Sequence, residues 1–227
     1  MTGDQEASVY YQHSGRVPLA SRISMQVRRK MYDAFAQWYR PTVETSVLDV
    51  GVTSDSSFQE SNYFERFYPW PERITCVGTE DGSELTRTFP GLKFQRVTPG
   101  EPLPYRDREF DLVFSNAVLE HTGSRESQER FVRELLRVGR AFFITTPNRW
   151  FPVEHHTGLP LLHYLPPGVH RALLKRTSYR YWAEEEHLNI LTARSMRSLF
   201  PAGVDVAVKT VALYGVLPSN LIAFGRL

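Results

Sequence analysis

The nine residues from Val47 to Asp55 constrain the fold of this 227-residue chain more than any other stretch. They begin as a short apolar run of strand-forming residues, break at Gly51 and continue through small polar residues. A segment of helical character, Phe58 to Tyr68, follows. This order is typical of a buried parallel strand whose carboxyl end opens into a ligand-binding turn. The stretch therefore predicts an α/β fold with a ligand at the end of its first strand.

The remainder of the chain alternates between predicted strands and predicted helices. After the first strand, at 46–51, apolar runs predict further strands at 73–79, 92–97, 110–115 and 140–146. Helical periodicity predicts helices at 20–39, 58–68, 124–138 and 192–199, with a short one ending at Phe89. Two consecutive strands, at 204–214 and 220–227, suggest an antiparallel hairpin at one edge. The alternation favours a parallel-rich sheet with helices on both faces.

Length and composition are those of one globular domain. A chain of 227 residues with 41% hydrophobic and 23% charged residues can bury the core of one α/β domain but is short for two. We therefore expect one domain over 1–227, in which 1–40 form an N-terminal tail and helix. The segment 148–190 is rich in proline, histidine, aromatic and basic residues and is long for a plain connection. It is predicted to form short helices and to act as a lid or specificity insert.

Charge and cysteine usage limit the classes of partner. The net charge is +2 and no dense run of Lys and Arg is present, so nucleic-acid binding is not predicted. The polar N-terminus and the lack of a long apolar stretch predict neither a signal peptide nor a transmembrane segment. The single cysteine, Cys76, fits a reducing compartment, so a cytoplasmic location is expected. The apolar and basic parts of the insert fit ordinary lid packing, cover for a hydrophobic acceptor, or peripheral contact with a membrane surface.

Polar residues gather where the predicted strands end. The first strand ends in Asp49–Asp55, the second at Glu80, the fourth in Asn116–His121 and the fifth in Pro147–His156. Open α/β sheets bind ligands at this edge. For a nucleoside ligand, Gly51 would allow close backbone approach and Glu80 would accept hydrogen bonds from both ribose hydroxyls.

Several motifs resemble those of class I S-adenosylmethionine-dependent methyltransferases, in the small-molecule type 11 branch. They are Val47–Gly51, Val77–Glu80, Leu103–Tyr105, Phe110–Val113 and Val118–His121. Each is weak alone, but their shared order and their placement at strand ends are specific. The resemblance covers residues 46–146 best. It implies a Rossmann-like methyltransferase sheet of order 3-2-1-4-5-7-6, with the last strand antiparallel and a helical lid insert.

The same resemblance implies S-adenosylmethionine as the cofactor. Asp49 and Gly51 would sit beside its methionine part, Glu80 would hold the ribose, and Asn116 would lie near the methyl donor. The full predicted cofactor-binding set is Asp49, Gly51, Thr53, Ser54, Glu80, Asp81 and Asn116. The chain departs from the family pattern in two places: Thr53 stands where a second glycine is usual, and Thr98-Pro99 stand where an aspartate often contacts adenine.

The candidate catalytic residues are His121, Glu154, His155 and His156. Glu154 beside either neighbouring histidine would form an acid–base pair, and imidazole is suited to deprotonating a hydroxyl near neutral pH. Structural roles are the alternative, with the insert anchored through hydrogen bonds and His121 packed in the core. No metal site is predicted, because adjacent histidines on a loop lack the i, i+4 helical spacing of typical ligands.

The sequence thus predicts methyl transfer to a small, partly hydrophobic acceptor, with O-methylation favoured. An aromatic lining supports this acceptor class: Tyr10, Tyr11, Trp150, Tyr164 and Trp182. The alternative is a non-catalytic binding or scaffold protein that retains the methyltransferase fold, which the departures at Thr53 and Pro99 would support. A nicotinamide dehydrogenase is disfavoured, since no G-x-G-x-x-G run follows the first strand.

Overall fold

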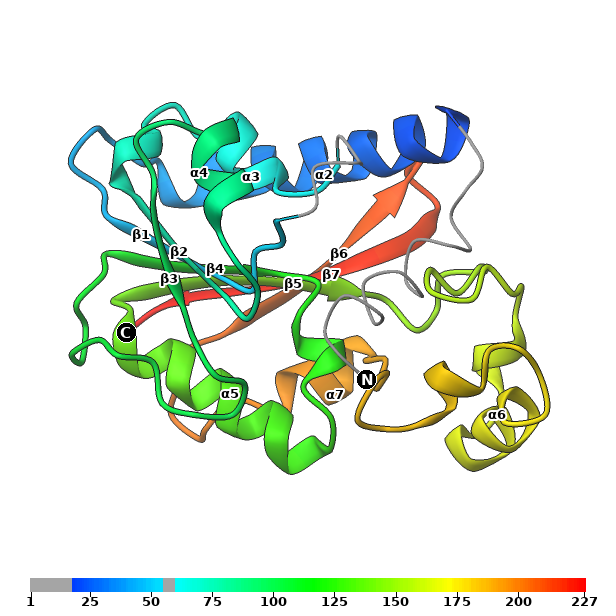
Figure 1. Cartoon of the computed structure of the whole chain (residues 1–227). Coiled ribbons are helices and arrows are strands. Elements are labelled where there is room, and N and C mark those ends of the chain that lie inside the picture. The colour runs from blue at the N-terminus through cyan, green and yellow to red at the C-terminus, as the bar shows by residue number, and fades with distance from the viewer. Residues whose placement is uncertain (1–17, 55–59) are drawn as a thin grey trace.

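A seven-stranded sheet of order β3-β2-β1-β4-β5-β7-β6 forms the centre of the molecule (Figure 1). The structure, a computed structural model, describes residues 18–54 and 60–227, with 18–22 described as backbone only. The strands are β1 Val47–Val50, β2 Ile74–Gly78, β3 Lys93–Arg96, β4 Leu112–Asn116, β5 Ala141–Pro147, β6 Ala207–Leu213 and β7 Leu217–Arg226. The first five strands run parallel, and β7 pairs antiparallel with both β5 and β6. The predicted strand order and terminal hairpin are confirmed.

Helices cover both faces of the sheet, as predicted. In Figure 1, α2, α3 and α4 lie above it and α5 and α7 below it. The α-helices are α2 Pro18–Tyr39, α3 Tyr63–Phe67, α4 Ser83–Thr88, α5 Arg125–Val138, α6 Pro167–Leu174 and α7 Ala193–Arg197. Within the described residues there are also four short 3₁₀ helices: η1 Pro71–Arg73, η2 Leu119–His121, η3 Leu162–Tyr164 and η4 Arg180–Ala183. Ser124 caps α5 as expected, since its hydroxyl accepts a hydrogen bond from the Ser127 amide.

Some boundaries differ from those predicted. The helix expected over 58–68 is observed only as α3, and residues 55–59 lie outside the described part of the chain. Strand β4 begins at Leu112 rather than at residue 110, because Asp111 instead bonds the preceding edge of β1: its carboxylate accepts from the amide and hydroxyl of Ser46. Strand β7 begins at Leu217, so the hairpin turn is tighter than expected.

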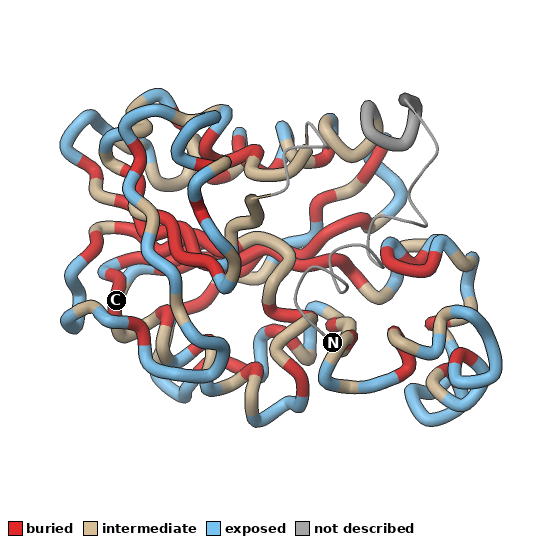
Figure 2. Tube along the Cα trace, in the orientation of Figure 1, coloured by how far each residue is buried: buried red, intermediate tan, exposed pale blue. Residues whose placement is uncertain are grey.

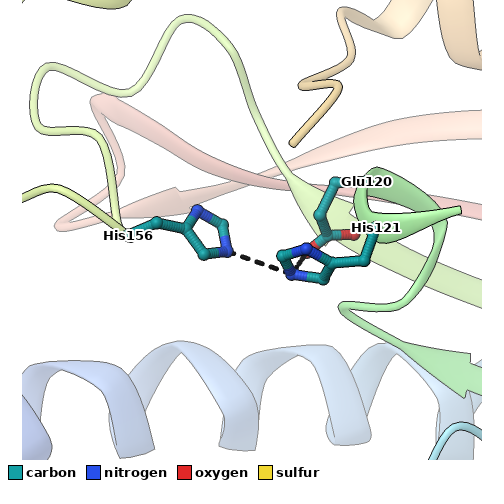
Figure 3. Close-up of side chains that lie close together, drawn as sticks. All are labelled: Glu120, His121 and His156. Atoms are coloured by element: carbon teal, nitrogen blue, oxygen red, sulfur yellow. Dashed lines mark hydrogen bonds and ion pairs between the residues drawn. The ribbon is translucent and has the colours of Figure 1, made fainter. Parts of the chain in front are cut away.

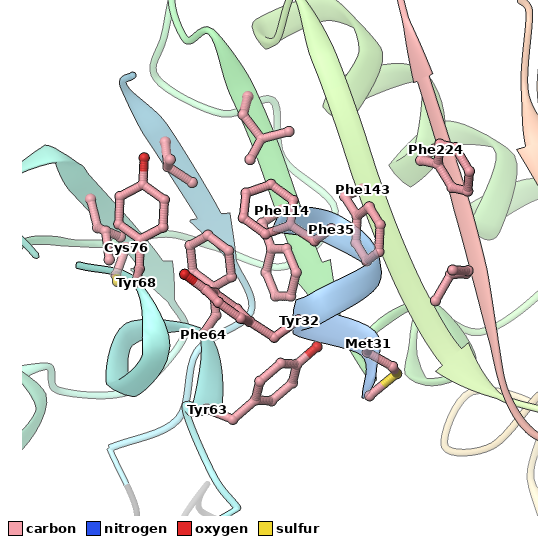
Figure 4. Packing of buried hydrophobic residues seen from close by; sticks show 14 of the residues in the cluster. Met31, Tyr32, Phe35, Tyr63, Phe64, Tyr68, Cys76, Phe114, Phe143 and Phe224 are labelled. Carbon is pink, nitrogen blue, oxygen red and sulfur yellow. The ribbon is translucent and has the colours of Figure 1, made fainter. Parts of the chain in front are cut away.

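The face under α2 and α3 is packed with aromatic rings (Figure 4). Phe114 is buried in its middle, with its ring centroid 4.1 Å from that of Phe64 and 5.9 Å from that of Phe143. Phe35 of α2 meets both Phe64 and Phe114 edge-on. Because residues alternate along β1, this face also receives the one acid of that strand, Asp49.

The N-terminal helix also joins the last two strands. Lys30 on α2 donates a hydrogen bond to the Ala212 carbonyl of β6 at 3.1 Å. The guanidinium of Arg226, at the end of β7, lies 5.7 Å from the Trp38 ring and 4.8 Å from the Tyr39 ring. The apolar side of α2 therefore has part of its partner surface at the far end of the chain.

The segment 148–190 lies beyond the carboxyl ends of β4 and β5, where Figure 1 shows α6 set apart from the sheet. It contains only short helical pieces, as expected, and has a small core of its own around Leu174, Trp182 and Leu188. Figure 2 shows mostly exposed and intermediate backbone in this part and mostly buried backbone along the central strands of the sheet. In the described ranges, we find no helix whose length and apolarity would let it cross a bilayer.

Replacing Phe114 by alanine tests the aromatic face. The side chain is 1% exposed, so truncation would leave a cavity against Phe64 and Phe143, and we expect a loss of about 3–5 kcal/mol in the free energy of unfolding. Urea denaturation followed by circular dichroism measures it. Val216→Ala is the control, because Val216 is 77% exposed and its truncation should change stability by less than about 0.5 kcal/mol. Equal losses in the two variants would contradict this packing.

Candidate active site

One continuous cleft of about 1590 Å³ opens at the carboxyl edge of the sheet. The ends of β1, β2 and β4 contribute Gly51, Glu80 and Asn116 to its wall, and the loop after β1 contributes Thr53. The 3₁₀ helix η2 and the segment 148–190 contribute the remaining predicted site residues, which are His121, Glu154, His155 and His156. Three predicted cofactor residues do not line the cleft: Asp49, Ser54 and Asp81.

The turn after β1 is held by side chains rather than by a second glycine. Asn62 clamps Thr53: its side-chain oxygen accepts from the Thr53 amide at 3.3 Å, and its side-chain nitrogen donates to the Thr53 carbonyl at 2.6 Å. The Ser54 hydroxyl donates to the Asp81 carbonyl, which ties this turn to the one after β2. These contacts give the turn a defined shape at the position where the sequence departs from the family pattern.

Gly51 is required by local packing as well as by its backbone. Its φ of +94° lies in the left-handed region that disfavours side chains. A Cβ atom there would also lie 2.1 Å from Val118 Cγ2. Glycine at position 51 therefore lets Val118, in the loop after β4, pack against the end of β1. This contact keeps the ends of β1 and β4 together.

Asp49 is 4% exposed, does not line the cleft, and lies beside Glu65 on the face of β1 that packs against α3. Its carboxyl shares a hydrogen bond with that of Glu65 on α3. Burial raises the pKa of Asp49 well above its ordinary range, and the nearby charge of Glu65 raises it further. Glu65 accepts a hydrogen bond from the Cys76 thiol at 3.4 Å. The acid of the first-strand motif is thus paired with a second buried acid in the core.

Two predicted cofactor residues, Glu80 and Asn116, line the cleft at the ends of β2 and β4. Glu80 is half-buried just past β2 and faces the cleft. Asn116 ends β4, and its side-chain oxygen accepts a hydrogen bond from the Thr145 hydroxyl on β5 at 2.6 Å. This bond orients the Asn116 amide group, leaving its nitrogen as a donor.

A pair of histidines, half-buried His121 and buried His156, joins η2 to the segment 148–190 (Figure 3). His121 Nδ1 donates to the His187 carbonyl at 2.7 Å, and His156 Nδ1 bonds Glu154 Oε1 at 2.6 Å. The two Nε2 atoms therefore face each other, 3.1 Å apart. Burial and the neighbouring His156 lower the pKa of His121. For His156, burial opposes the charged form, but Glu154 and Glu120 outweigh it and raise its pKa.

Glu154 is the anchor of this arrangement. Beyond the His156 ring, its carboxylate accepts hydrogen bonds from the His156 amide and from the amide and hydroxyl of Thr157, at 2.7 to 2.9 Å. Burial alone would raise the pKa of Glu154, but these donors and the charge of His156 lower it below its ordinary value. The buried anion thereby orders the loop that presents His156 to the cleft.

Glu120 completes the cluster and was not among the predicted site residues. It is fully buried, and its Oε2 accepts from the Thr146 hydroxyl at 2.9 Å. Its Oε1 lies 3.9 Å from His121 Nε2, and no hydrogen-bond donor reaches it from the described residues. Burial raises the pKa of Glu120 to about 7. The signal in the sequence was its position directly before His121.

The remaining predicted residues differ in how close they lie to the His121–His156 pair. His155 is exposed, and its ring stacks on Phe151 with 5.0 Å between centroids. Trp150 is 49% exposed and stands edge-on to Tyr164, whereas Trp182 is buried against His121 and His156. The residues Tyr10 and Tyr11 lie outside the described part of the chain.

Comparison with known families gives one match. Residues 49–141 match a family model described as "Methyltransferase domain". The matched stretch begins at Asp49, the third residue of β1, runs through β4 and α5, and ends at Ala141, the first residue of β5. A search of curated proteins finds no match.

Solved structures with this fold are numerous, and three represent them. A SAM-dependent methyltransferase from Methanosarcina mazei is 16% identical, with a TM-score of 0.54 over 82% of this chain and 94% of that one. The complex of DhpI with SAM and HEP is 14% identical, with a TM-score of 0.58 over 98% and 96%. The plantazolicin methyltransferase BamL, in complex with a triazolic desmethylPZN analogue and SAH, is 13% identical, with a TM-score of 0.59 over 98% and 91%. At these identities the likeness establishes a shared fold.

Glu65→Gln tests the buried acid pair through pH. A carboxyl whose pKa is raised in the folded state stabilises the fold at low pH, and that contribution is lost as pH rises through the folded-state pKa. Removing the Glu65 charge should bring the pKa of Asp49 down toward its ordinary value. The variant should therefore lose less stability than the parent between pH 5 and pH 8, by about 1.4 kcal/mol for each pKa unit removed.

Urea denaturation at the two pH values measures this difference. Glu72→Gln, an exposed acid on η1, is the matched control and should follow the parent curve. A Glu65→Gln difference that is the same at pH 5 and pH 8 would exclude titration of this pair as its cause.

Proposed function

Since this chain carries a class I, S-adenosylmethionine-dependent methyltransferase domain, we propose that it methylates a hydroxyl group of a small, partly hydrophobic acceptor. The observation that carries the proposal is the continuity of the cleft. One cavity reaches from Gly51 and Glu80, at the ends of β1 and β2, to His121 and His156 beneath the insert. A cofactor and an acceptor can therefore occupy it together, with their reacting atoms in contact.

The cofactor half is assigned to the ends of β1, β2 and β4. Glu80 would accept hydrogen bonds from the ribose hydroxyls, the turn at Gly51 and Thr53 would border the methionine part, and Asn116 would lie beside the sulfonium. Asp49, Ser54 and Asp81 act indirectly in this assignment. Ser54 and Asp81 join the turn after β1 to the turn after β2, and Asp49 pairs with Glu65 in the core between β1 and α3.

The acceptor half is assigned to η2 and the segment 148–190. Its wall combines apolar side chains, among them Phe151, Val153 and Trp182, with the imidazole groups of His121 and His156. An apolar wall suits a partly hydrophobic molecule, and polar groups at its inner end suit an acceptor atom that must lose a proton. A hydroxyl needs such activation more than an amine does, which favours O-methylation.

Transfer from a sulfonium requires the acceptor atom in line behind the methyl group, so alignment and exclusion of water supply much of the rate. The insert meets both needs if it covers the acceptor, because Glu154 holds its loop rigidly over the cleft. A scaffold that has lost the cofactor is the competing function. It predicts that the cleft binds no S-adenosylmethionine.

Binding of S-adenosylmethionine measured by calorimetry decides between these two functions. We expect micromolar affinity for the parent chain, and a loss of at least about 10-fold for Glu80→Ala, because two hydrogen bonds to a charged acceptor are removed. Glu72→Ala removes an exposed acid outside the cleft and should bind as the parent does. No binding of either S-adenosylmethionine or S-adenosylhomocysteine at high micromolar concentration would refute the proposal.

The acceptor half is tested with His121→Ala. Formation of S-adenosylhomocysteine is followed with a panel of small hydroxylated aromatic compounds, and the rate should fall by about 100-fold or more, since the variant lacks the imidazole beside the acceptor. Affinity for S-adenosylmethionine should stay within about 3-fold of the parent value. A rate equal to that of Glu72→Ala would remove His121 from the reaction.

A further inference from the structure

We propose that Glu120, His121 and His156 form a binding site for a divalent transition-metal ion, best suited to Zn²⁺, at the inner end of the cleft. The metal's role in catalysis rests on the proposed function, but its binding does not. The sequence favoured no metal site because it drew attention to the adjacent pair His155 and His156. The structure instead brings together His121 and His156, which are 35 residues apart.

The ring geometry suits a shared ion. Figure 3 shows the His156 ring on one side of the site and the His121 ring and Glu120 carboxylate, both from η2, on the other. The Nε2 atoms are 3.1 Å apart. With Zn–N bonds of about 2.0–2.1 Å, this separation corresponds to an N–Zn–N angle of about 100°, near the tetrahedral value. One oxygen of Glu120 and the two ring nitrogens lie within 4.8 Å of one another. A shift of the Glu120 carboxylate by roughly 1 Å would bring its oxygen within bonding distance of an ion held by the two ring nitrogens.

Both rings are already oriented as metal ligands are. A ligating histidine usually donates its other ring N–H to a carbonyl or carboxylate, which fixes the ring and directs the second nitrogen toward the ion. His121 Nδ1 is engaged by the His187 carbonyl and His156 Nδ1 by the Glu154 carboxylate. Glu154 is in turn fixed by Thr157, so the outer ligand sphere is rigid.

The unpaired carboxylate oxygen of Glu120 supports a bound cation independently of the histidine geometry. A carboxylate oxygen buried without a donor is costly, and such atoms are rare in folded proteins. Glu120 is 0% exposed, and Oε1 has no donor among the residues described, although Oε2 is satisfied by Thr146. A proton shared between the two rings would explain their 3.1 Å separation but would leave Oε1 unsatisfied. A cation explains all three groups at once.

Three protein ligands leave a position open, as in catalytic zinc sites. All three line the cleft, so the open position faces the proposed acceptor pocket. The acceptor hydroxyl would bind there, the ion would lower its pKa, and its proton would pass to bulk solvent through the open cleft. Its oxygen would then form a bond to the methyl carbon, while the carbon–sulfur bond breaks and its electron pair stays on sulfur. The products are the methyl ether and S-adenosylhomocysteine.

The test measures metal binding on the full chain, without cofactor or acceptor. Protein freed of metal with EDTA is titrated with Zn²⁺ by calorimetry and with Co²⁺ by visible absorption, which reports tetrahedral coordination. We expect one equivalent to bind the parent chain. Glu120→Gln and His121→Ala should each weaken Zn²⁺ binding by about 10-fold or more, and His155→Ala should bind as the parent does. Glu120→Gln is nearly isosteric and keeps an oxygen for Thr146, so circular dichroism should show it folded.

Two outcomes would overturn the site. One is absence of saturable Zn²⁺ and Co²⁺ binding by the parent chain. The other is loss of binding in His155→Ala with retention in Glu120→Gln, which would move the ion to the exposed histidine. Because S-adenosylmethionine affinity is measured separately, a chain that binds the cofactor but no metal refutes only this site, and one that binds metal but no cofactor refutes only the proposed function.

Discussion

The parallel pairing of β1 with both β2 and β4 determines where every polar group of the cleft is found. Val47 pairs with Ile74 on one side and with Leu112 on the other, so the three strands end at the same edge. Parallel strands buried on both faces leave their ends as the natural place for unpaired backbone and side-chain polar groups. The loop after β4 can approach β1 closely because position 51 is a glycine. The position of the cleft is thus determined by strand register, and the particular catalytic residues do not determine it.

Most of the fold could be predicted because it depends on local patterns. Apolar runs, helix caps and the spacing of motifs are visible along the chain, and the strand order follows once the family resemblance is seen. The boundaries that differed depend on distant partners: Asp111 leaves β4 because Ser46, 65 residues earlier, offers it a donor. Similarly, nothing near Asp49 in the sequence indicates that Glu65 would turn its carboxyl to the core.

The site was predictable in its elements and less so in its contacts. Gly51, Glu80 and Asn116 line the cleft, as their places at strand ends predict, and so do His121 and His156. Three other predicted strand-end residues do not: Asp49, Ser54 and Asp81. Their direct contact was not foreseeable, since it depends on the path of a 43-residue insert between β5 and α7. His155 appeared equivalent to His156 in the sequence, but its ring stacks on Phe151. Neighbouring residues on a loop need not share a direction. Glu120 was overlooked because a buried acid is recognised only when its surroundings are known.

The docking of α2 against β6 and β7 has a consequence for how the chain acquires its structure. The helix is synthesised well before β6 and β7, which supply part of the surface that covers its apolar side. Until β7 is inserted between β5 and β6, the sheet ends at β5 and the aromatic face stays incompletely covered. Contacts between sequence-distant segments close late, because their loop entropy must be offset first. The ribosome must therefore release β7 before this core can close, and until then the nascent chain must avoid aggregating through its own aromatic face.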